Sequence, residues 1–272
     1  MKTILVATDF SPAASNAVDY AADMALCIKA DLLLLHIVQV PISYSDVPVV
    51  ITQEDLLRGV EQQIEELKQK LVAKTNGTLQ IGTEVRMGGF FTELKAFCEN
   101  SHPYAVIMGS QGTTAAERLF FGGHAAHAMR HLEWPLITIP PGARFSAIKK
   151  IGLACDFNKV VDTMPVEEVK MLVNDFNARL EVLNTGPEGT YDPEVVFESG
   201  LLQEMLAGLN PGYHFISSEN IDKGIVDFAD RNQIDLLIVL PKRHGLLGEL
   251  VHKSHTKQLV LHSHVPVIAL HL

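Results

Sequence analysis

The sequence contains few cysteines, and none of them lies close to another. Its 272 residues include three, Cys27, Cys98 and Cys155, which form no C-x-x-C motif. A disulfide framework or a cysteine-rich zinc site needs several cysteines at short, regular spacings, so the sequence argues against both. We therefore expect reduced, buried thiols, which fit a cytoplasmic protein.

Long hydrophobic runs are also missing. The longest, around residues 32–35 and 236–240, have the length of a strand, whereas a membrane helix needs roughly 18–20 apolar residues. Asp9 interrupts the apolar start of the chain before it reaches the length of a secretory signal. We expect no membrane partner and a cytoplasmic location.

Positive charge is scarce, and so are the common catalytic motifs. With 22 Lys and Arg against 32 Asp and Glu, the net charge is −10, and neither half of the chain carries a basic block. Binding to a nucleic-acid backbone depends on such blocks, so we expect no nucleic-acid partner. G-x4-G-K-[S/T], H-E-x-x-H and G-x-S-x-G are all absent. We predict that the protein is not an enzyme, or at most a weak ATPase.

What the sequence does contain is an internal repeat. The stretch Ala7-Thr-Asp-Phe10 returns as Ala154-Cys-Asp-Phe157, and H-L-E-W-P-L-I-T-I at residues 131–139 resembles H-S-H-V-P-V-I-A-L at residues 262–270. The chain is long enough for two domains of ordinary size. We predict one domain over residues 1–141 and a second over residues 147–272, joined by a short linker that begins with Pro140-Pro141-Gly142.

Each repeat alternates short apolar runs with segments of helical periodicity. In the first repeat Leu32–Val38 is almost continuously apolar, as expected of a strand covered on both faces. This alternation predicts an α/β fold in which each domain is a five-stranded parallel sheet with helices on both faces. Ligands of such sheets bind beyond the carboxyl ends of the strands, which here carry Asp9 and Gly109.

A glycine-containing segment follows the fourth predicted strand. It runs M-G-S-Q-G from Met108 to Gly112 and, after nine residues, G-G-H from Gly122 to His124, where a helix is predicted. Backbone N–H groups at the start of a helix attract anions, and glycine lets the backbone approach a phosphate closely. The segment is therefore a candidate phosphate site, although such glycines also serve ordinary turns and helix packing.

These segments together resemble the universal stress protein family over essentially the whole chain. The resemblance is carried by V-A-T-D-F-S at 6–11, L-L-H-I-V at 34–38, I-M-G-S-Q-G at 107–112 and P-L-I-T-I-P at 135–140. It implies two tandem Rossmann-like domains of the adenine nucleotide alpha hydrolase-like type. It also implies binding of an adenine nucleotide, ATP or AMP, and pairing of the two domains through their fifth strands, while a homodimer stays open.

The family's nucleotide pattern is G-x2-G-x9-G-[S/T] after a first-strand aspartate. The first domain matches it at Asp9, Gly109, Gly112 and Gly122 but has Gly123 where Ser or Thr is expected, which removes one hydroxyl donor to the phosphates. By resemblance, the base, ribose and phosphates would contact Ala7, Thr8, Asp9, Ile37, Met108, Gly109, Gln111, Gly112, Gly122, Gly123, His124 and Ala125.

The second domain departs much further from the pattern. Pro241 stands at the position of Gly109 and Lys253 at that of Gly122, although Asp156 remains. Proline removes a backbone donor and a lysine side chain crowds the approach of a phosphate. We therefore predict a nucleotide site in the first domain only.

Other features have two interpretations. Asp9 either contacts the ligand or has a role in the turn or as a helix cap, and the segment Pro41–Thr52 is either a lid or a variable loop. The histidines at 124, 127 and 131, and at 252 and 255, lie at helical spacing, which suits either a metal site or a polar helix face, and we predict no metal.

Three functions are compatible with these features. The first is a nucleotide-binding regulatory protein of the stress response, and the second is a scaffold or interaction protein in which neither domain binds nucleotide. The third is a related adenine-nucleotide enzyme, which would need an S-G-G-x-D-S loop after the first strand. T-D-F-S at residues 8–11 does not supply that loop.

Overall fold

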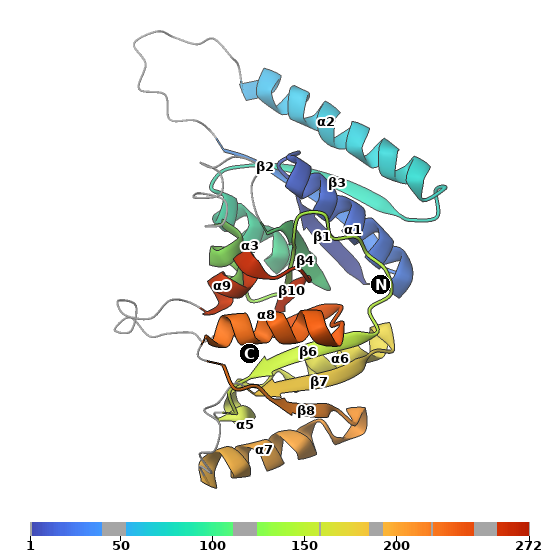
Figure 1. Ribbon diagram of the computed structural model, residues 1–272. Helices are drawn as coiled ribbons and strands as arrows, with labels where there is room; N and C mark the ends of the chain where they lie inside the picture. Colours follow the sequence, from blue (N-terminus) through green and yellow to red (C-terminus); the bar gives the residue numbers. More distant parts are fainter. Residues whose placement is uncertain are drawn as a thin grey trace.

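Ten strands from the described part of the chain form one continuous sheet in the computed structural model. The structure describes residues 2–39, 53–110, 124–157, 159–184, 193–218, 220–241 and 255–271. The strand order is β3-β2-β1-β4-β5-β10-β9-β6-β7-β8. Elements of the first half, blue to green in Figure 1, lie on one side of the β5–β10 junction, and those of the second half lie on the other.

The first half alternates strands and helices as the sequence predicts. Its described elements are β1 (Thr3–Ala7), α1 (Pro12–Ile28), β2 (Asp31–Val38), α2 (Gln53–Lys74), β3 (Ile81–Met87), α3 (Phe90–Ser101), β4 (Ala105–Gly109), a helix over residues 124–131, and β5 (Leu136–Ile139). Strands β1 to β5 pair in parallel, with β1 between β2 and β4.

The second half repeats this order with one clear difference. Its described elements are β6 (Lys150–Cys155), α5 (Val160–Thr163), α6 (Val166–Phe176), β7 (Arg179–Asn184), α7 (Pro193–Met205), a 3-10 turn (Ala207–Leu209), β8 (Gly212–Phe215), α8 (Ile221–Asn232), β9 (Leu236–Val239), α9 (His255–His262) and β10 (Val267–Ala269). The sequence predicts one helix from Thr163 to Asn177, but the structure has α5 and α6 on either side of Pro165. A proline inside a helix removes a backbone hydrogen bond and clashes with the preceding turn, so α6 begins directly after it.

The two halves join through their last strands, which confirms the predicted pairing of the domains within the chain. β5 and β10 run antiparallel, with Ile137 opposite Ile268 and Thr138 opposite Val267. Both strands are buried along their described length, so the pairing covers two apolar edges that would otherwise be exposed.

A polar cluster on one face of the sheet also links the halves. Asp175 of α6 forms an ion pair with Lys2 and accepts a hydrogen bond from the Tyr104 hydroxyl over 2.8 Å. Burial, together with this carboxylate, raises the pKa of Tyr104 above its usual range, so the phenol stays protonated and donates. The cluster therefore fixes how α6 of the second half lies against the first.

Helices cover both faces of the sheet, as predicted. One apolar core contains side chains of α1, α2, α6 and α7, and the other contains side chains of α3, residues 124–131, α8 and α9. Strands such as β2, β4, β5 and β9 are nearly continuous apolar runs because both of their faces are covered. The described residues include no helix that is both long and apolar enough to span a membrane.

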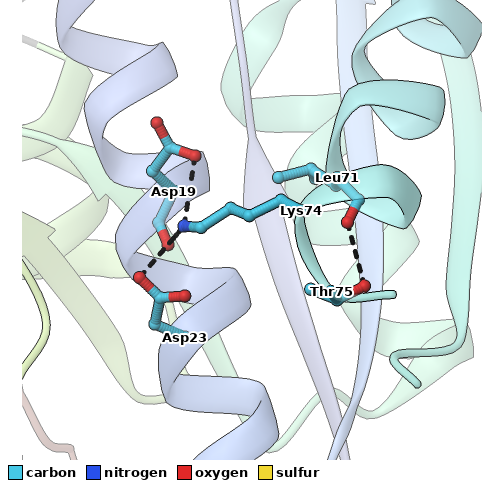
Figure 2. Close-up of polar contacts among 5 residues, drawn as sticks. All are labelled: Asp19, Asp23, Leu71, Lys74 and Thr75. Atoms are coloured by element: carbon cyan, nitrogen blue, oxygen red, sulfur yellow. Dashed lines mark hydrogen bonds and ion pairs between the residues drawn. The ribbon is translucent and has the colours of Figure 1, made fainter. Parts of the chain in front are cut away.

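Lys74 anchors the end of α2 to α1. Its ammonium lies 3.3 Å from a carboxylate oxygen of Asp19 and 3.0 Å from one of Asp23, as Figure 2 shows. A cation near the last turn of α2 also suits the negative end of the helix. In the same turn the Thr75 hydroxyl donates to the Leu71 carbonyl over 2.9 Å (Figure 2), so the end of α2 has a defined geometry.

Candidate functional site

The candidate site lies where β2, β1 and β4 end side by side. Strand order reverses between β1 and β4, because the chain continues from β1 to β2 and β3 on one side and returns to β4 on the other. Ala7, Ile37 and Met108, one from each strand, belong to the same apolar core, on the face covered by α3. They are 6, 8 and 8% exposed, so only their outer atoms reach the edge of the sheet. The structure thus brings two residues predicted to line the base pocket, Ala7 and Ile37, into one core with Met108, which was predicted to frame the ribose and phosphates.

Asp9 follows β1 and is exposed. Its Oδ1 accepts the Ser11 N–H over 3.0 Å, and the Ser11 hydroxyl in turn accepts the Ala14 N–H over 3.2 Å as the N-cap of α1. One of the two interpretations of Asp9, a role in the turn and helix start, is therefore present in the structure. A carboxylate has further acceptor positions, so this bond leaves Asp9 able to accept from a ligand hydroxyl.

Thr8 and Phe10 build the turn that carries Asp9. Thr8 is 5% exposed, its N–H donates to the Leu35 carbonyl of β2, and its Oγ1 accepts the Phe10 N–H over 3.1 Å. Phe10 has a φ of 63°, in the left-handed region that side chains rarely adopt. The chain thus turns sharply after β1, and Asp9 lies at the bend.

His36 also belongs to this site, although the sequence patterns did not single it out. Its Nδ1 lies 2.7 Å from the Thr8 carbonyl, and its ring stacks on Phe10 with 4.7 Å between centroids and 21° between planes. Burial lowers the pKa of His36, and the Thr8 carbonyl and the charge of Asp9 oppose that effect. The signal was available in the sequence, because His36 interrupts an otherwise apolar strand.

Gly109 ends β4 against the first turn of α1. A Cβ built on Gly109 would lie 3.0 Å from the Ala13 carbonyl oxygen and 3.1 Å from its carbon. The close approach of backbone that the sequence suggested is therefore present here, but toward α1. The next residue, Ser110, is 1% exposed, and its Oγ has no hydrogen-bond partner among the described residues.

The starts of α1 and α3 lie at the same edge. α1 starts beyond β1, α3 starts after Gly89, and the helix over residues 124–131 is described from His124 onward. Parallel strand-helix units place every helix start at the carboxyl edge, where the positive ends of the helix dipoles favour an anion. Ala125 is buried, and the His124 ring lies 5.1 Å from the Phe90 ring, so this helix contacts the first turn of α3.

The histidines of residues 124–131 pack against aromatic side chains. The Phe91 ring lies 4.7 Å from that of His127 and 6.4 Å from that of His131, and the two imidazoles are 4.4 Å apart. Burial and the nearby His131, Arg130 and His124 lower the pKa of His127. Within the described ranges, no group of three His, Cys, Asp or Glu side chains is arranged to hold a metal.

Several predicted features lie outside the described residues. They are Gln111, Gly112, Gly122 and Gly123, the Pro41–Thr52 segment, and His252 and Lys253 of the second domain. The phosphate loop therefore stays a prediction from sequence, as do the ligand roles of the twelve predicted site residues.

The second domain keeps the turn but changes its residues. The Phe157 N–H lies 3.4 Å from Cys155 Sγ, and Phe157 has a φ of 50°. Asn184 replaces His36 and donates from Nδ2 to the Cys155 carbonyl over 3.2 Å. Phe157 is 2% exposed and packs edge-on against Phe215, so this turn is part of a core.

Comparisons with known proteins agree with this architecture. A sequence profile described as the Universal stress protein family matches residues 1–140 and again residues 147–271. A universal stress protein of Synechocystis is 24% identical over 294 residues, covering 98% of this chain and 99% of that protein. A universal stress protein structure from Archaeoglobus fulgidus has a TM-score of 0.75 at 16% identity, covering 99% of this chain and 96% of that one.

A second solved structure, a putative universal stress protein from Pseudomonas aeruginosa, has a TM-score of 0.62 at 14% identity and covers 99% of this chain and 93% of its own. At these identities the structures show the shared fold. The family profile, by contrast, matches nearly the whole sequence in two copies. The chain therefore belongs to the universal stress protein family, as a tandem of two family domains.

Proposed function

We propose that the protein is a nucleotide-binding regulatory member of its family, with one adenine-nucleotide site in the first domain. The observation that carries this proposal is the convergence of Ala7, Ile37 and Met108 at a point where strand order reverses, with Asp9 exposed beside them. A site of this shape offers an apolar surface for a base and a carboxylate for ribose hydroxyls.

The phosphates would extend from this point toward the helix starts. Gly109 ends β4 next to α1, and His124 lies against Phe90 in the first turn of α3. Helix N-termini and glycine backbone favour anions, which supports ATP or AMP over an uncharged ligand. In the second domain Pro241 stands in place of Gly109, so we propose that this domain binds no nucleotide.

We also propose that binding occurs without efficient turnover. The sequence contains no P-loop lysine motif and no nucleophile elbow. Retention of unhydrolysed ATP over hours of incubation would support this, whereas steady release of phosphate would contradict it.

Titration calorimetry with ATP and AMP tests the site. We expect at most one site per chain, weakened by Asp9→Ala and unaffected by the matched change Asp156→Ala in the second domain. Because Asp9 also accepts the Ser11 N–H, the unfolding free energy of both variants must be measured without ligand. Two equivalent sites, or equal effects of the two substitutions, would contradict a site confined to the first domain.

The second candidate is a scaffold that binds no nucleotide. It is favoured by the structural reasons now visible for two motif residues: Asp9 accepts a backbone N–H near the start of α1, and Gly109 makes room for Ala13. If the parent protein binds neither ATP nor AMP at millimolar concentration, this candidate replaces the first.

A further inference from the structure

The two domains end their first strands in the same turn, although its residues differ. In the first domain Thr8 Oγ1 accepts the Phe10 N–H, and in the second Cys155 Sγ lies 3.4 Å from the Phe157 N–H. Both phenylalanines have positive φ, 63° and 50°. A strained conformation that is present twice in one chain must be stabilised by its surroundings in each copy.

A side chain of the second strand of each domain provides that stabilisation. His36 Nδ1 lies 2.7 Å from the Thr8 carbonyl oxygen, and Asn184 Nδ2 lies 3.2 Å from the Cys155 carbonyl oxygen. The positions correspond, because Ala7 pairs with Leu35 in one domain and Ala154 with Leu183 in the other. A carbonyl only accepts, so His36 must carry its proton on Nδ1. An imidazole and an amide thus perform the same task.

This hydrogen bond fixes the direction in which Asp9 points. The Thr8 carbonyl belongs to the planar peptide group that joins Thr8 to Asp9. Fixing its oxygen therefore fixes the orientation of the peptide plane that leads into Asp9. On the other side of Asp9, the Phe10 ring stacks on the same imidazole. His36 therefore restrains both neighbours of Asp9.

We infer that His36 is a positioning residue for the nucleotide site, which orients Asp9 toward the ligand through the Thr8 carbonyl. The inference rests on the proposed nucleotide binding. The inference gives the two hydrogen bonds different roles. The bond from Asn184 to the Cys155 carbonyl maintains a turn in the second domain. The bond from His36 to the Thr8 carbonyl maintains a turn that carries the ligand-binding carboxylate of Asp9.

Three variants measured by calorimetry with ATP test this role. His36→Ala removes the bond and the ring, and we expect an affinity about three- to tenfold weaker, the range for one lost hydrogen bond. His36→Asn supplies the amide that the second domain uses, and we expect affinity close to that of the parent protein. Asn184→Ala is the matched control, which should lower the urea midpoint as His36→Ala does without changing ATP affinity.

A double-mutant cycle separates positioning from general destabilisation. If His36 acts through Asp9, then His36→Ala should have no further effect on ATP affinity in an Asp9→Ala background. Additive effects would overturn the inference, as would an unchanged affinity of His36→Ala. If His36→Asn is as weak as His36→Ala, the ring and not the hydrogen bond would be responsible, and the inference would fail.

A measurement without ligand distinguishes failure of the positioning role of His36 from failure of the proposed nucleotide binding. In the ¹⁵N spectrum of histidine-labelled protein, we expect His36 as the Nδ1–H tautomer at neutral pH. A parent protein that shows this tautomer but binds neither ATP nor AMP would overturn both the proposed function and the positioning role, leaving His36 a purely structural residue. A parent protein that binds ATP with the opposite tautomer would overturn the positioning role alone.

Discussion

Replacing Gly109 with alanine tests whether close packing against α1 is the reason for a glycine at this position. The new Cβ would lie 3.0 Å from the Ala13 carbonyl oxygen, 3.1 Å from its carbon and 3.3 Å from its Cβ. Two of these atoms belong to backbone, which cannot rotate away as a side chain can. The first turn of α1 or the end of β4 must therefore shift by a few tenths of an ångström.

The size of the effect follows from two opposing terms. Overpacking of this kind costs about 1–3 kcal/mol, and the loss of unfolded-chain entropy on Gly→Ala stabilises by about 0.4–1 kcal/mol. We therefore expect Gly109→Ala to lower the free energy of unfolding by about 1–2 kcal/mol. The φ of Gly109 is not in the left-handed region, so backbone strain adds nothing.

Gly59→Ala is the matched control, because it is the same chemical change in open space. Gly59 lies within α2, and apart from its chain neighbours and the nearby backbone of its own helix no described atom lies within 4 Å of the position of its added Cβ. We expect it to stabilise the protein by about 0.5–1 kcal/mol, the helix preference for alanine over glycine. Urea denaturation of both variants, with equal m-values, checks the pair. A neutral or stabilising Gly109→Ala would refute the packing argument.

Three further predictions concern titration, the contact between domains and the phosphate loop. Because burial lowers the pKa of His36 and of His127 from the ordinary value of 6.5, the unfolded chain binds their protons more tightly. The free energy of unfolding should therefore be highest above pH 6.5 and fall as the pH is lowered. The decline should be smaller in His36→Asn, and urea titrations at pH 7.5 and 5.5 would measure it. Asp175→Ala should lower the unfolding free energy by about 1–3 kcal/mol, because it leaves the Tyr104 hydroxyl without its partner. Lys74→Ala removes the exposed ion pairs with Asp19 and Asp23 and should lower the unfolding free energy by less than about 1 kcal/mol. Equal effects of Asp175→Ala and Lys74→Ala would contradict this ranking. Gly123→Ser restores the hydroxyl of the family pattern and should strengthen ATP binding by about 1–3 kcal/mol and adenosine binding much less, by calorimetry. An equal gain for both ligands would show that the hydroxyl does not meet a phosphate.

Much of the fold was predictable because its signals are local. Strand and helix periodicities, the repeated A-x-D-F motif and the matching ends of the two halves predicted two α/β domains. The pairing of β5 with β10 was predicted from the family resemblance, in agreement with two short apolar strands that would otherwise be exposed. The sequence also identified Ala7, Ile37 and Met108, which the structure brings into one apolar core.

Only the tertiary structure decided what these residues contact. The sequence left Asp9 between ligand contact and a turn or helix-cap role, and the structure shows a hydrogen bond from the Ser11 N–H within the turn, with Ser11 as the N-cap. It explains Gly109 by the approach of Ala13, and it gives His36 a role because β2 lies beside the end of β1. Such contacts join residues far apart in the chain, and their geometry depends on how strands and helices pack. Periodicity specifies which residues face inward, whereas packing alone determines which atoms meet there.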